Sequence, residues 1–235
     1  MRATDLAALN AARLGRKAVL SVTPLSGNGG FILLEGQPAP QGLEESAENA
    51  FRSGKSTLVE AGDETLFLNV YLPPPRIVII GAVHISQALA GLSAIAGFDL
   101  VVIDSRTAFA TPERFAGVDL VADWPEDVLA LRPLDPYCAL VAVTHDPKID
   151  DFPLKAALDC GCFYVGALGS RKTHATRVER LRAEGVAQGM IDRISAPIGL
   201  DIGAANPPEI AVAILADIIR AFRSRSVSAN VGSTA

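Results

Sequence analysis

From Arg76 onward, short apolar runs alternate with segments of helical periodicity. Because the runs lack the period-two alternation of a half-exposed strand, we interpret them as fully buried strands. The predicted strands are Ile77–Ile80, Leu100–Ile103, Asp119–Val121, Ala139–Val143 and Phe163–Val165. The predicted helices are Gln87–Ala96, Glu126–Leu131, Asp151–Cys160, Thr173–Ala183 and Pro208–Phe222. This alternation predicts an α/β domain with a Rossmann-like, doubly wound parallel sheet that is covered on both faces.

The first 72 residues have a different pattern and predict a small α+β unit. Helices are expected at 3–14 and 42–54, and strands at 17–23, 31–34, 56–60 and 65–72. Pro73-Pro-Pro75 forms a stiff extended spacer, which makes it the best domain boundary in the chain. We therefore expect an N-terminal domain at 1–72 and a Rossmann-like domain at 73–223. A flexible tail rich in Ser, Ala and Gly is expected at 224–235.

Composition restricts the class of protein. Of the 235 residues, 49% are hydrophobic and 20% are charged, which is enough apolar side chain for a substantial core. The formal net charge of −5 argues against a nucleic-acid partner, which would favour a basic surface. The start of the chain lacks a signal-peptide pattern, and three cysteines form no disulfide framework. A cytoplasmic protein is the expectation.

One segment raises the alternative of a membrane span. Ile77 to Phe98 contains no Asp, Glu, Lys or Arg, and its length would cross a bilayer. Against a span stand the polar residues His84, Ser86 and Gln87 in its middle, together with several glycines. A strand, a turn and a buried helix explain this composition better, and we expect no membrane contact.

The first strand of the predicted sheet enters a glycine turn, Gly81-Ala-Val-His84, that opens into a helix. A dinucleotide fingerprint needs a second glycine so that the backbone can approach a pyrophosphate, but Val83 occupies that position. Ligand binding with a different geometry and a plain tight turn both remain open. Asp104 ends the second strand, at the spacing of a residue that accepts from ribose hydroxyls. An acidic strand end that serves solubility is the alternative.

Thr144-His-Asp146 follows the fourth strand of the predicted sheet. Ligands bind at the carboxyl ends of strands in open α/β sheets, and these residues offer a hydroxyl, an imidazole and a carboxylate there. We favour a functional role over the alternative that Asp146, which precedes Pro147, only initiates a turn.

The most specific local run is Gly166-Ala-Leu-Gly-Ser-Arg-Lys-Thr173. Arg171 and Lys172 fall in the first turn of a predicted helix, where cations oppose the helix macrodipole. Backbone N–H groups after Gly169, the hydroxyl of Ser170 and the two cations together predict an anion receptor, with phosphate as the expected anion. The alternative is a charged helix start in solvent.

Two further features carry weaker signals. Asp201 lies between two glycines in the loop 196–203, which suits close approach to a ligand but also a plain crossover of the sheet. Cys160 and Cys162 do not complete a tetrahedral ligand set, so we interpret them as buried structural thiols rather than a metal or redox site.

Several of these runs together resemble the XdhC/CoxI family of accessory proteins for molybdenum hydroxylases such as xanthine dehydrogenase. The resemblance covers residues 73 to 222. It rests on Pro73-Pro-Pro-Arg-Ile-Val-Ile-Ile-Gly-Ala-Val-His84, Asp104-Ser-Arg106, Pro112-Glu-Arg-Phe115, Thr144-His-Asp146, Gly166-Ala-Leu-Gly-Ser-Arg-Lys172, Pro197-Ile-Gly-Leu-Asp-Ile-Gly203 and Pro208-Glu-Ile-Ala211.

The resemblance implies a Rossmann-like domain that binds the molybdenum cofactor, molybdopterin, as cargo. It also implies a homodimer, sulfuration of the cofactor by a cysteine desulfurase, and delivery to a xanthine dehydrogenase-like molybdenum hydroxylase subunit. Such a protein is a chaperone rather than a catalyst, and no catalytic residue is assigned. The pterin's terminal phosphate would suit Ser170, Arg171 and Lys172.

The chain departs from the family pattern at two places. Val83 replaces the second glycine of the usual Gly-Ala-Gly-His turn. In the N-terminal part, Ser26-Gly-Asn-Gly-Gly30 stands where the family usually carries Ser-Ser-Pro-Arg and Gly-Gly-Cys segments, and no cysteine precedes Cys138. The alternatives from other classes are an NAD(P)-dependent oxidoreductase and a nucleotide-sensing module without turnover.

The predicted cofactor-binding residues combine the local signals with the runs that carry the resemblance. No metal ligands are predicted. The cofactor-binding residues are Gly81, His84, Asp104, Arg106, Thr144, His145, Asp146, Gly169, Ser170, Arg171, Lys172 and Asp201.

Overall fold

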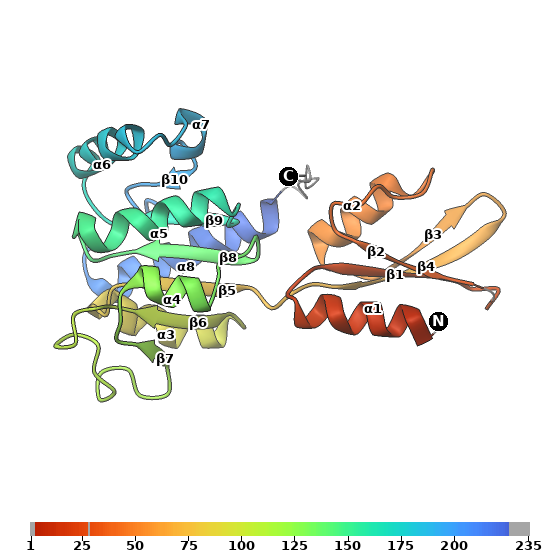
Figure 1. Ribbon diagram of the computed structural model, residues 1–235, viewed down its shortest axis with the longest axis horizontal. Coiled ribbons are helices and arrows are strands. Elements are labelled where there is room, and N and C mark those ends of the chain that lie inside the picture. Colours follow the sequence, from red (N-terminus) through yellow and green to blue (C-terminus); the bar gives the residue numbers. More distant parts are fainter. Residues whose placement is uncertain (1–2, 28, 226–235) are drawn as a thin grey trace. The chain divides into compact units, whose positions relative to one another are not determined.

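The computed structural model describes residues 3–27 and 29–225 (Figure 1). Within that part, the chain divides into two compact units, one up to Pro73 together with Arg223–Arg225, and the other from Pro74 to Phe222. The guanidinium of Arg225 donates a hydrogen bond to the carbonyl of Phe51 at 3.1 Å, within the first unit. Most of the predicted tail, residues 226–235, lies outside the described residues.

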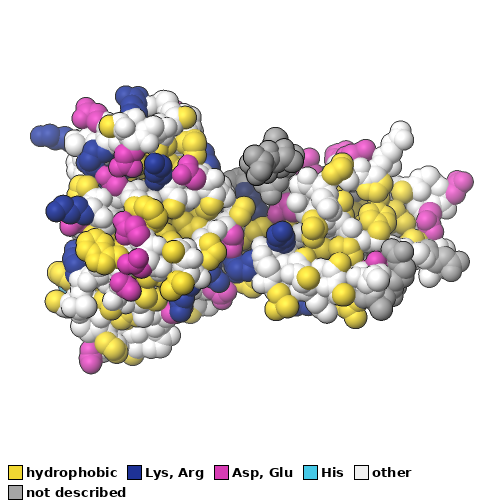
Figure 2. All heavy atoms as spheres, in the orientation of Figure 1, with side chains coloured by type: hydrophobic (Ala, Val, Ile, Leu, Met, Phe, Trp, Pro, Cys, Tyr) yellow, Lys and Arg dark blue, Asp and Glu magenta, His cyan; other side chains and the backbone are white. Residues whose placement is uncertain are grey.

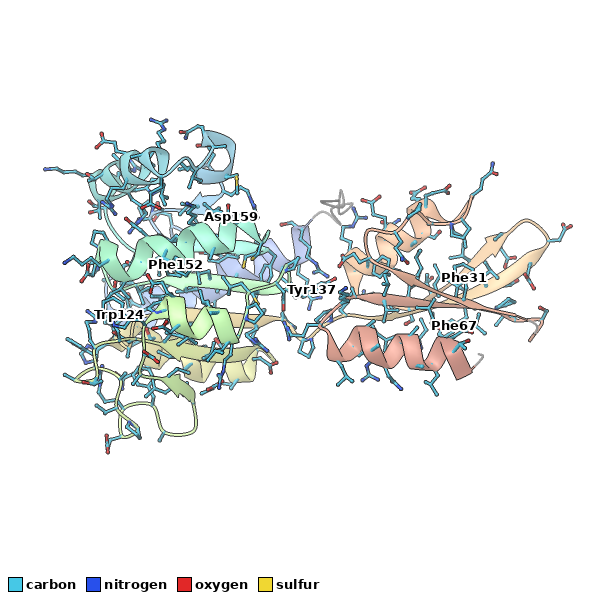
Figure 3. The ribbon with its side chains drawn as sticks, viewed as in Figure 1. Phe31, Phe67, Trp124, Tyr137, Phe152 and Asp159 are labelled. Atoms are coloured by element: carbon cyan, nitrogen blue, oxygen red, sulfur yellow. The ribbon has the colours of Figure 1, made fainter. Side chains whose placement is uncertain are left out.

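The first unit is a four-stranded antiparallel sheet with one helix on each face (Figure 1). The strand order is β2-β1-β4-β3. The strands are β1 (Val19–Pro24), β2 (Phe31–Leu34), β3 (Thr57–Ala61) and β4 (Glu64–Tyr71), and the helices are α1 (Ala3–Leu14) and α2 (Glu44–Ser53). Phe31 on β2 and Phe67 on β4 are labelled in Figure 3.

Side-chain alternation in the strands explains why this sheet carries helices on both faces. Leu9 and Ala12 of α1 pack against Val19, whose neighbour Leu20 faces the opposite side and is fully buried. On α2, Ala47, Ala50 and Phe51 recur at helical spacing and are all buried. Both faces of the central strand β1 are therefore covered by a helix.

The second unit is a six-stranded sheet in which every neighbouring pair is parallel. Its strands are β5 (Arg76–Ile80), β6 (Asp99–Ile103), β7 (Asp119–Val121), β8 (Cys138–Ala142), β9 (Tyr164–Ala167) and β10 (Ile194–Ser195). The order is β10-β9-β8-β5-β6-β7, which counted from β5 as strand 1 is the 6-5-4-1-2-3 order of doubly wound nucleotide-binding sheets. The direction of winding reverses between β5 and β8, and ligands of doubly wound sheets bind at the carboxyl ends of the strands at such a point.

Helices cover both faces of this sheet, as Figure 1 shows. One face packs against α3 (His84–Ile95) and α8 (Pro207–Ser224). The other packs against α4 (Pro125–Leu131), α5 (Pro147–Asp159), α6 (Arg171–Ala183) and α7 (Gln188–Ile191). The predicted fold class is confirmed.

Alternate side chains of β5 show why its sequence is apolar throughout. Ile77 and Ile79 face α3 and α8, whereas Val78 and Ile80 face the opposite layer, and none of the four is more than 3% exposed. Each side chain buried in this way stabilises the fold by roughly 1.5–3 kcal/mol. A run without polar alternation is therefore the expected sequence of a central parallel strand.

Several element boundaries differ from the predictions. Helix α3 begins at His84, three residues early, and the hydroxyl of Ser86 donates to the carbonyl of Gly81 at 2.5 Å in its first turn. Helix α5 begins at Pro147 because the Asp146 carboxylate caps the backbone N–H of Lys148 at 3.0 Å. The short elements α7 and β10 were not predicted.

The segment 77–98 forms β5, a turn and α3 rather than one continuous helix. Across the described residues, no helix combines the length and apolar character that spanning a bilayer requires.

Candidate functional site

The turn after β5 packs directly against the end of β8. Gly81 has φ +117°, a conformation that favours glycine, and a β-carbon built on it would lie 2.9 Å from Cγ2 of Thr144. Val83 is half-buried and extended, with φ −107° and ψ 176°, and it precedes the exposed His84 at the start of α3. The glycine thus allows two strand ends to approach each other at the point where the winding reverses.

Asp104, at the end of β6, supports this turn. Its Oδ2 accepts from the backbone N–H of Ala82 at 2.7 Å, and its carboxylate accepts from the guanidinium of Arg106 at 2.9 and 2.8 Å. Burial raises the pKa of Asp104, but the hydrogen bonds from Arg106 and Ala82 outweigh it and hold the pKa below its usual value. The side chain is fully buried, so these contacts compete with the predicted contact to a ribose.

Arg114 holds the same turn from the other side, and sequence reasoning assigned it no role in the site. Its Nη1 donates to the carbonyl of Ala82 at 3.0 Å and to that of Phe109 at 2.8 Å. Its Nη2 donates to the side-chain oxygen of Gln87 at 3.2 Å. The backbone at Ala82 is therefore fixed at both its N–H and its carbonyl.

The segment after β8 joins the turn to helix α5. The hydroxyl of Thr144 donates to Oδ1 of Asp150 at 2.7 Å, and the backbone N–H of Asp146 donates back to that hydroxyl at 3.0 Å. Between them, His145 is exposed and has φ +64°, a conformation uncommon for a residue with a β-carbon. Such backbone strain gathers at functional sites, where the surrounding contacts hold it.

The loop after β9 has the arrangement of an anion receptor. Gly169 has φ +137°, and Ser170 caps α6 by accepting from the backbone N–H of Thr173 at 3.2 Å. Arg171 and Lys172 are both exposed in the first turn of α6. Backbone N–H groups and two exposed cations thus lie at one helix N-terminus, the geometry that proteins use for phosphate.

A cavity of about 280 Å³ lies between the loop after β8 and the first turns of α6. His145 and Lys172 are exposed and form its rim, whereas Asp150 and Arg177 are buried and form its interior. The lining residues are His145, Pro147, Asp150, Asp151, Lys172, Thr173, Thr176, Arg177 and Arg180. The structure therefore brings two separately predicted groups, His145 and Lys172, to the same opening. Basic and acidic side chains intermingle on the surface of this unit (Figure 2).

Two arginines and two aspartates line this cavity, and only one arginine is hydrogen-bonded to an aspartate. Arg180 donates to both carboxylate oxygens of Asp151, at 2.6 and 3.0 Å. Arg177 and Asp150 are 2% and 1% exposed and do not bond to each other. Burial raises the pKa of Asp150 to about 6, against lowering contributions from Thr144 and Arg177.

Apart from His145 and Lys172, the predicted residues are not among those that line the cavity. Asp201 is exposed on the loop between β10 and α8 and is not among the residues that line the cavity. The Sγ atoms of Cys160 and Cys162 are 3.5 Å apart beyond the end of α5, where Cys162 is buried and Cys160 partly so. A second hollow, of about 590 Å³, lies along α5. Phe152 and Asp159, both labelled in Figure 3, are among the residues that line it.

The sequence from 77 to 218 matches the family model of the XdhC Rossmann domain. It holds all of the parallel sheet except Arg76, and every residue that lines the cavity. This match covers more than half of the chain. The chain belongs to the XdhC family.

Curated relatives of this XdhC chain include three bacterial proteins. One is a Bacillus subtilis protein named as a probable component of xanthine dehydrogenase, 30% identical over 207 residues, or 87% of this chain and 61% of that protein. Identity to the molybdenum cofactor insertion chaperone PaoD of Escherichia coli is 28% over 148 residues, or 63% of this chain and 40% of PaoD. Identity to the uncharacterized protein YqeB of Escherichia coli is 32%, over 68% of this chain and 29% of YqeB. The chain thus spans less than two thirds of each relative.

A crystal structure of a xanthine dehydrogenase from Bacillus halodurans has a similar fold. The TM-score is 0.64 at 26% sequence identity, and the match covers 95% of this chain and 65% of that one. Both units of the XdhC chain therefore have counterparts in a solved protein.

Within the XdhC domain, the site residues that sequence reasoning missed include two buried charged residues of the cavity, Asp150 and Arg177. A signal for each was present, because Asp150 precedes the buried Leu154 by four residues and Arg177 precedes the buried Leu181 by four. A charged residue on the apolar stripe of a helix is buried, and a buried charge needs a partner or a role.

Proposed function

We propose that this chain is an accessory protein that binds the molybdenum cofactor as cargo and delivers it to a xanthine dehydrogenase-like molybdenum hydroxylase. Two relatives support the proposal, one named as a probable component of xanthine dehydrogenase and one as a molybdenum cofactor insertion chaperone. Because the chain spans only part of each, the activity is inferred from the site as well as from the names.

The observation that carries the proposal is the meeting of an anion-binding loop with a cavity at the carboxyl edge of the sheet. Lys172 lines the cavity, Gly169, Ser170 and Arg171 directly precede it in the chain, and the cavity continues inward between α5 and α6. Its volume of about 280 Å³ lies near the lower end of ligand pockets, which begin at about 300 Å³. We infer that it encloses one end of the cofactor while the terminal phosphate stays at the rim.

Physical chemistry favours this orientation. A phosphate carries two negative charges near neutral pH, and an exposed helix N-terminus with Arg171 and Lys172 offsets them without burying an ion. Asp150 and Asp151 line the interior, where a phosphate would meet their negative charge. The phosphate therefore belongs at the rim and the less charged end inside.

The nicotinamide-dependent alternative lacks support. Val83 stands where a second glycine would admit a pyrophosphate. Both carboxylate oxygens of Asp104 accept hydrogen bonds from Ala82 or Arg106, so ribose hydroxyls would have to displace them. The comparisons with known proteins add nothing in its favour.

Two finer parts of the proposal concern partners. A cysteine desulfurase would sulfurate the bound cofactor before delivery, and the chain would act as a homodimer. Both stay predictions. Co-purification with a desulfurase and sedimentation of the purified chain test them separately.

The test of the proposed function is reconstitution of an apo-hydroxylase with released molybdenum cofactor, with and without the purified chain. We expect faster activation with the chain, together with saturable binding of the cofactor to the chain alone. Replacing both Arg171 and Lys172 by alanine should weaken binding by about tenfold or more, because two charge-assisted contacts are lost.

A matched control replaces Lys17 and Lys55, two exposed lysines of the first unit, by alanine. This variant has the same change of net charge and should bind as the unmodified chain does. Equal weakening in both double variants would mean that net charge alone attracts the cofactor. Absence of binding by the unmodified chain would overturn the proposed function.

A further inference from the structure

Two buried residues that line the cavity, Asp150 and Arg177, have polar side-chain atoms without a hydrogen-bond partner in the described part of the chain. Oδ2 of Asp150 has no hydrogen-bond partner within the described residues, and neither Nε nor Nη1 of Arg177 has one. Both residues are at least 98% buried and line the cavity. Leaving such groups unpaired costs about 1–3 kcal/mol each, and more for charged groups.

The remaining polar atoms of both side chains are held in place. Thr144 donates to Oδ1 of Asp150 at 2.7 Å, which fixes the carboxylate from the end of β8. Arg177 donates from Nη2 to the carbonyl of Leu168 at 3.1 Å, which fixes the guanidinium from the end of β9. Neither group is free to swing out to solvent, so the acceptor and the donors keep a defined arrangement.

The charges of this wall select among ligand groups. A phosphate or carboxylate at Arg177 would also meet the carboxylate of Asp150, and an ammonium group at Asp150 would meet the guanidinium. A neutral group that carries an N–H donor beside a carbonyl acceptor satisfies both at once. The N–H would donate to Oδ2 of Asp150, and the carbonyl would accept from Arg177.

We propose that Asp150 and Arg177 form a recognition site for a lactam edge, an adjacent N–H and C=O on a ring. Pterins and guanine share this edge. This inference deepens the proposed function and rests on it for the choice of pterin as the physiological source. With the phosphate at Lys172 and the lactam inside, one ligand would span the cavity from rim to interior.

The test compares two bicyclic probes that differ only at this edge. Pterin carries a ring N–H beside a carbonyl, whereas 2,4-diaminopteridine carries a ring nitrogen acceptor beside an amino donor. Titration calorimetry with the unmodified full chain should give at least tenfold tighter binding of pterin than of 2,4-diaminopteridine. The second probe would place its ring nitrogen acceptor against the Asp150 carboxylate and its amino donor against the Arg177 guanidinium. Neither probe has a phosphate, so the result does not depend on the rim.

Two substitutions assign the effect to residues. Asp150→Asn and Arg177→Gln should each weaken pterin binding by about tenfold or more and reduce the preference over 2,4-diaminopteridine. The controls Asp159→Asn on α5 and Arg182→Gln on α6 make the same chemical changes at exposed positions outside this cavity, and they should leave binding unchanged. Thermal unfolding checks that each variant is folded.

The outcomes separate this inference from the proposed function. Preference for guanosine over pterin, lost in Asp150→Asn, would keep the lactam site and argue against a pterin cargo. Pterin binding of equal strength to 2,4-diaminopteridine would overturn the lactam site while leaving cofactor binding at the rim intact. No binding of either lactam at millimolar concentration would overturn the site as well. The comparison of probes uses the unmodified chain and holds even where a substituted chain fails to fold.

Discussion

Gly81, in the turn after β5, packs closely against Thr144, in the segment after β8. A β-carbon built on Gly81 would lie 2.9 Å from Cγ2 of Thr144. Gly81→Ala should therefore destabilise the Rossmann-like unit by about 1–3 kcal/mol through the clash and the strained φ of +117°. Urea unfolding measures the change.

Gly91→Ala is the matched control for that substitution. Gly91 lies inside α3 with no atom within 4 Å of a built β-carbon, so alanine there should stabilise the fold by roughly 0.5–1 kcal/mol. Opposite signs for the two substitutions are the expected result. Equal effects of the two substitutions would contradict a clash between a β-carbon at position 81 and Thr144.

The carboxylate of Asp104 is expected to be structural in addition to any role in binding. Asp104→Asn removes the ionic hydrogen bonds from Arg106 and weakens the one from Ala82, so it should cost about 1–3 kcal/mol of unfolding free energy. Asp119→Asn is the control, because the pair of Asp119 with Arg132 is exposed on both sides. It should cost less than about 1 kcal/mol. Similar costs for both would contradict the supporting role of Asp104.

The raised pKa of Asp150 predicts a pH-dependent stability. Because the folded pKa is about 6 and the usual value is 3.8, this group favours folding most at low pH. The free energy of unfolding that this group contributes falls by up to about 3 kcal/mol as the pH rises through about 6. The groups around it are Arg177 and Arg180 from α6, Thr144 after β8, Asp151 beside it and, farther away, Arg106.

Asp150→Asn isolates this contribution from that of other carboxyl groups. The unfolding free energy of the unmodified chain, minus that of the variant, should fall between pH 4 and pH 7 and then level off. The measurement is denaturant unfolding of both proteins across that range. A difference that stays constant or rises with pH would mean that the pKa of the Asp150 carboxyl group is not raised by burial.

The strands of the sheet were predictable because burial on both faces leaves a simple signature. Ile77–Ile80 has apolar side chains on both faces of the sheet, and no amphipathic helix produces such a short continuous run. The elements that escaped prediction, α7 and β10, have four and two residues. Such short elements form from tertiary contacts, such as the parallel pairing of Ile194 with Val165, rather than from local pattern.

The rim of the candidate site was predictable, whereas its interior was not. His145 and Lys172 lie within a few residues of the ends of β8 and β9, and the rule on carboxyl ends of parallel strands places them together. Asp150 and Arg177 lie within helices, where charged residues usually face solvent. Their spacing of four residues from Leu154 and Leu181 is a signal for burial, but their meeting in one cavity depends on how α5 packs against α6.

The location of the cargo tests the central claim most directly. Hydrogen exchange of the purified chain, followed by mass spectrometry with and without molybdopterin, reports which backbone segments the cofactor covers. We predict slower exchange in peptides that span 144–150 and 169–177, the two walls of the cavity, and unchanged exchange in α2 of the first unit. Protection confined to α2 or to the outer surface of α8, with none in the two walls, would contradict binding at this site.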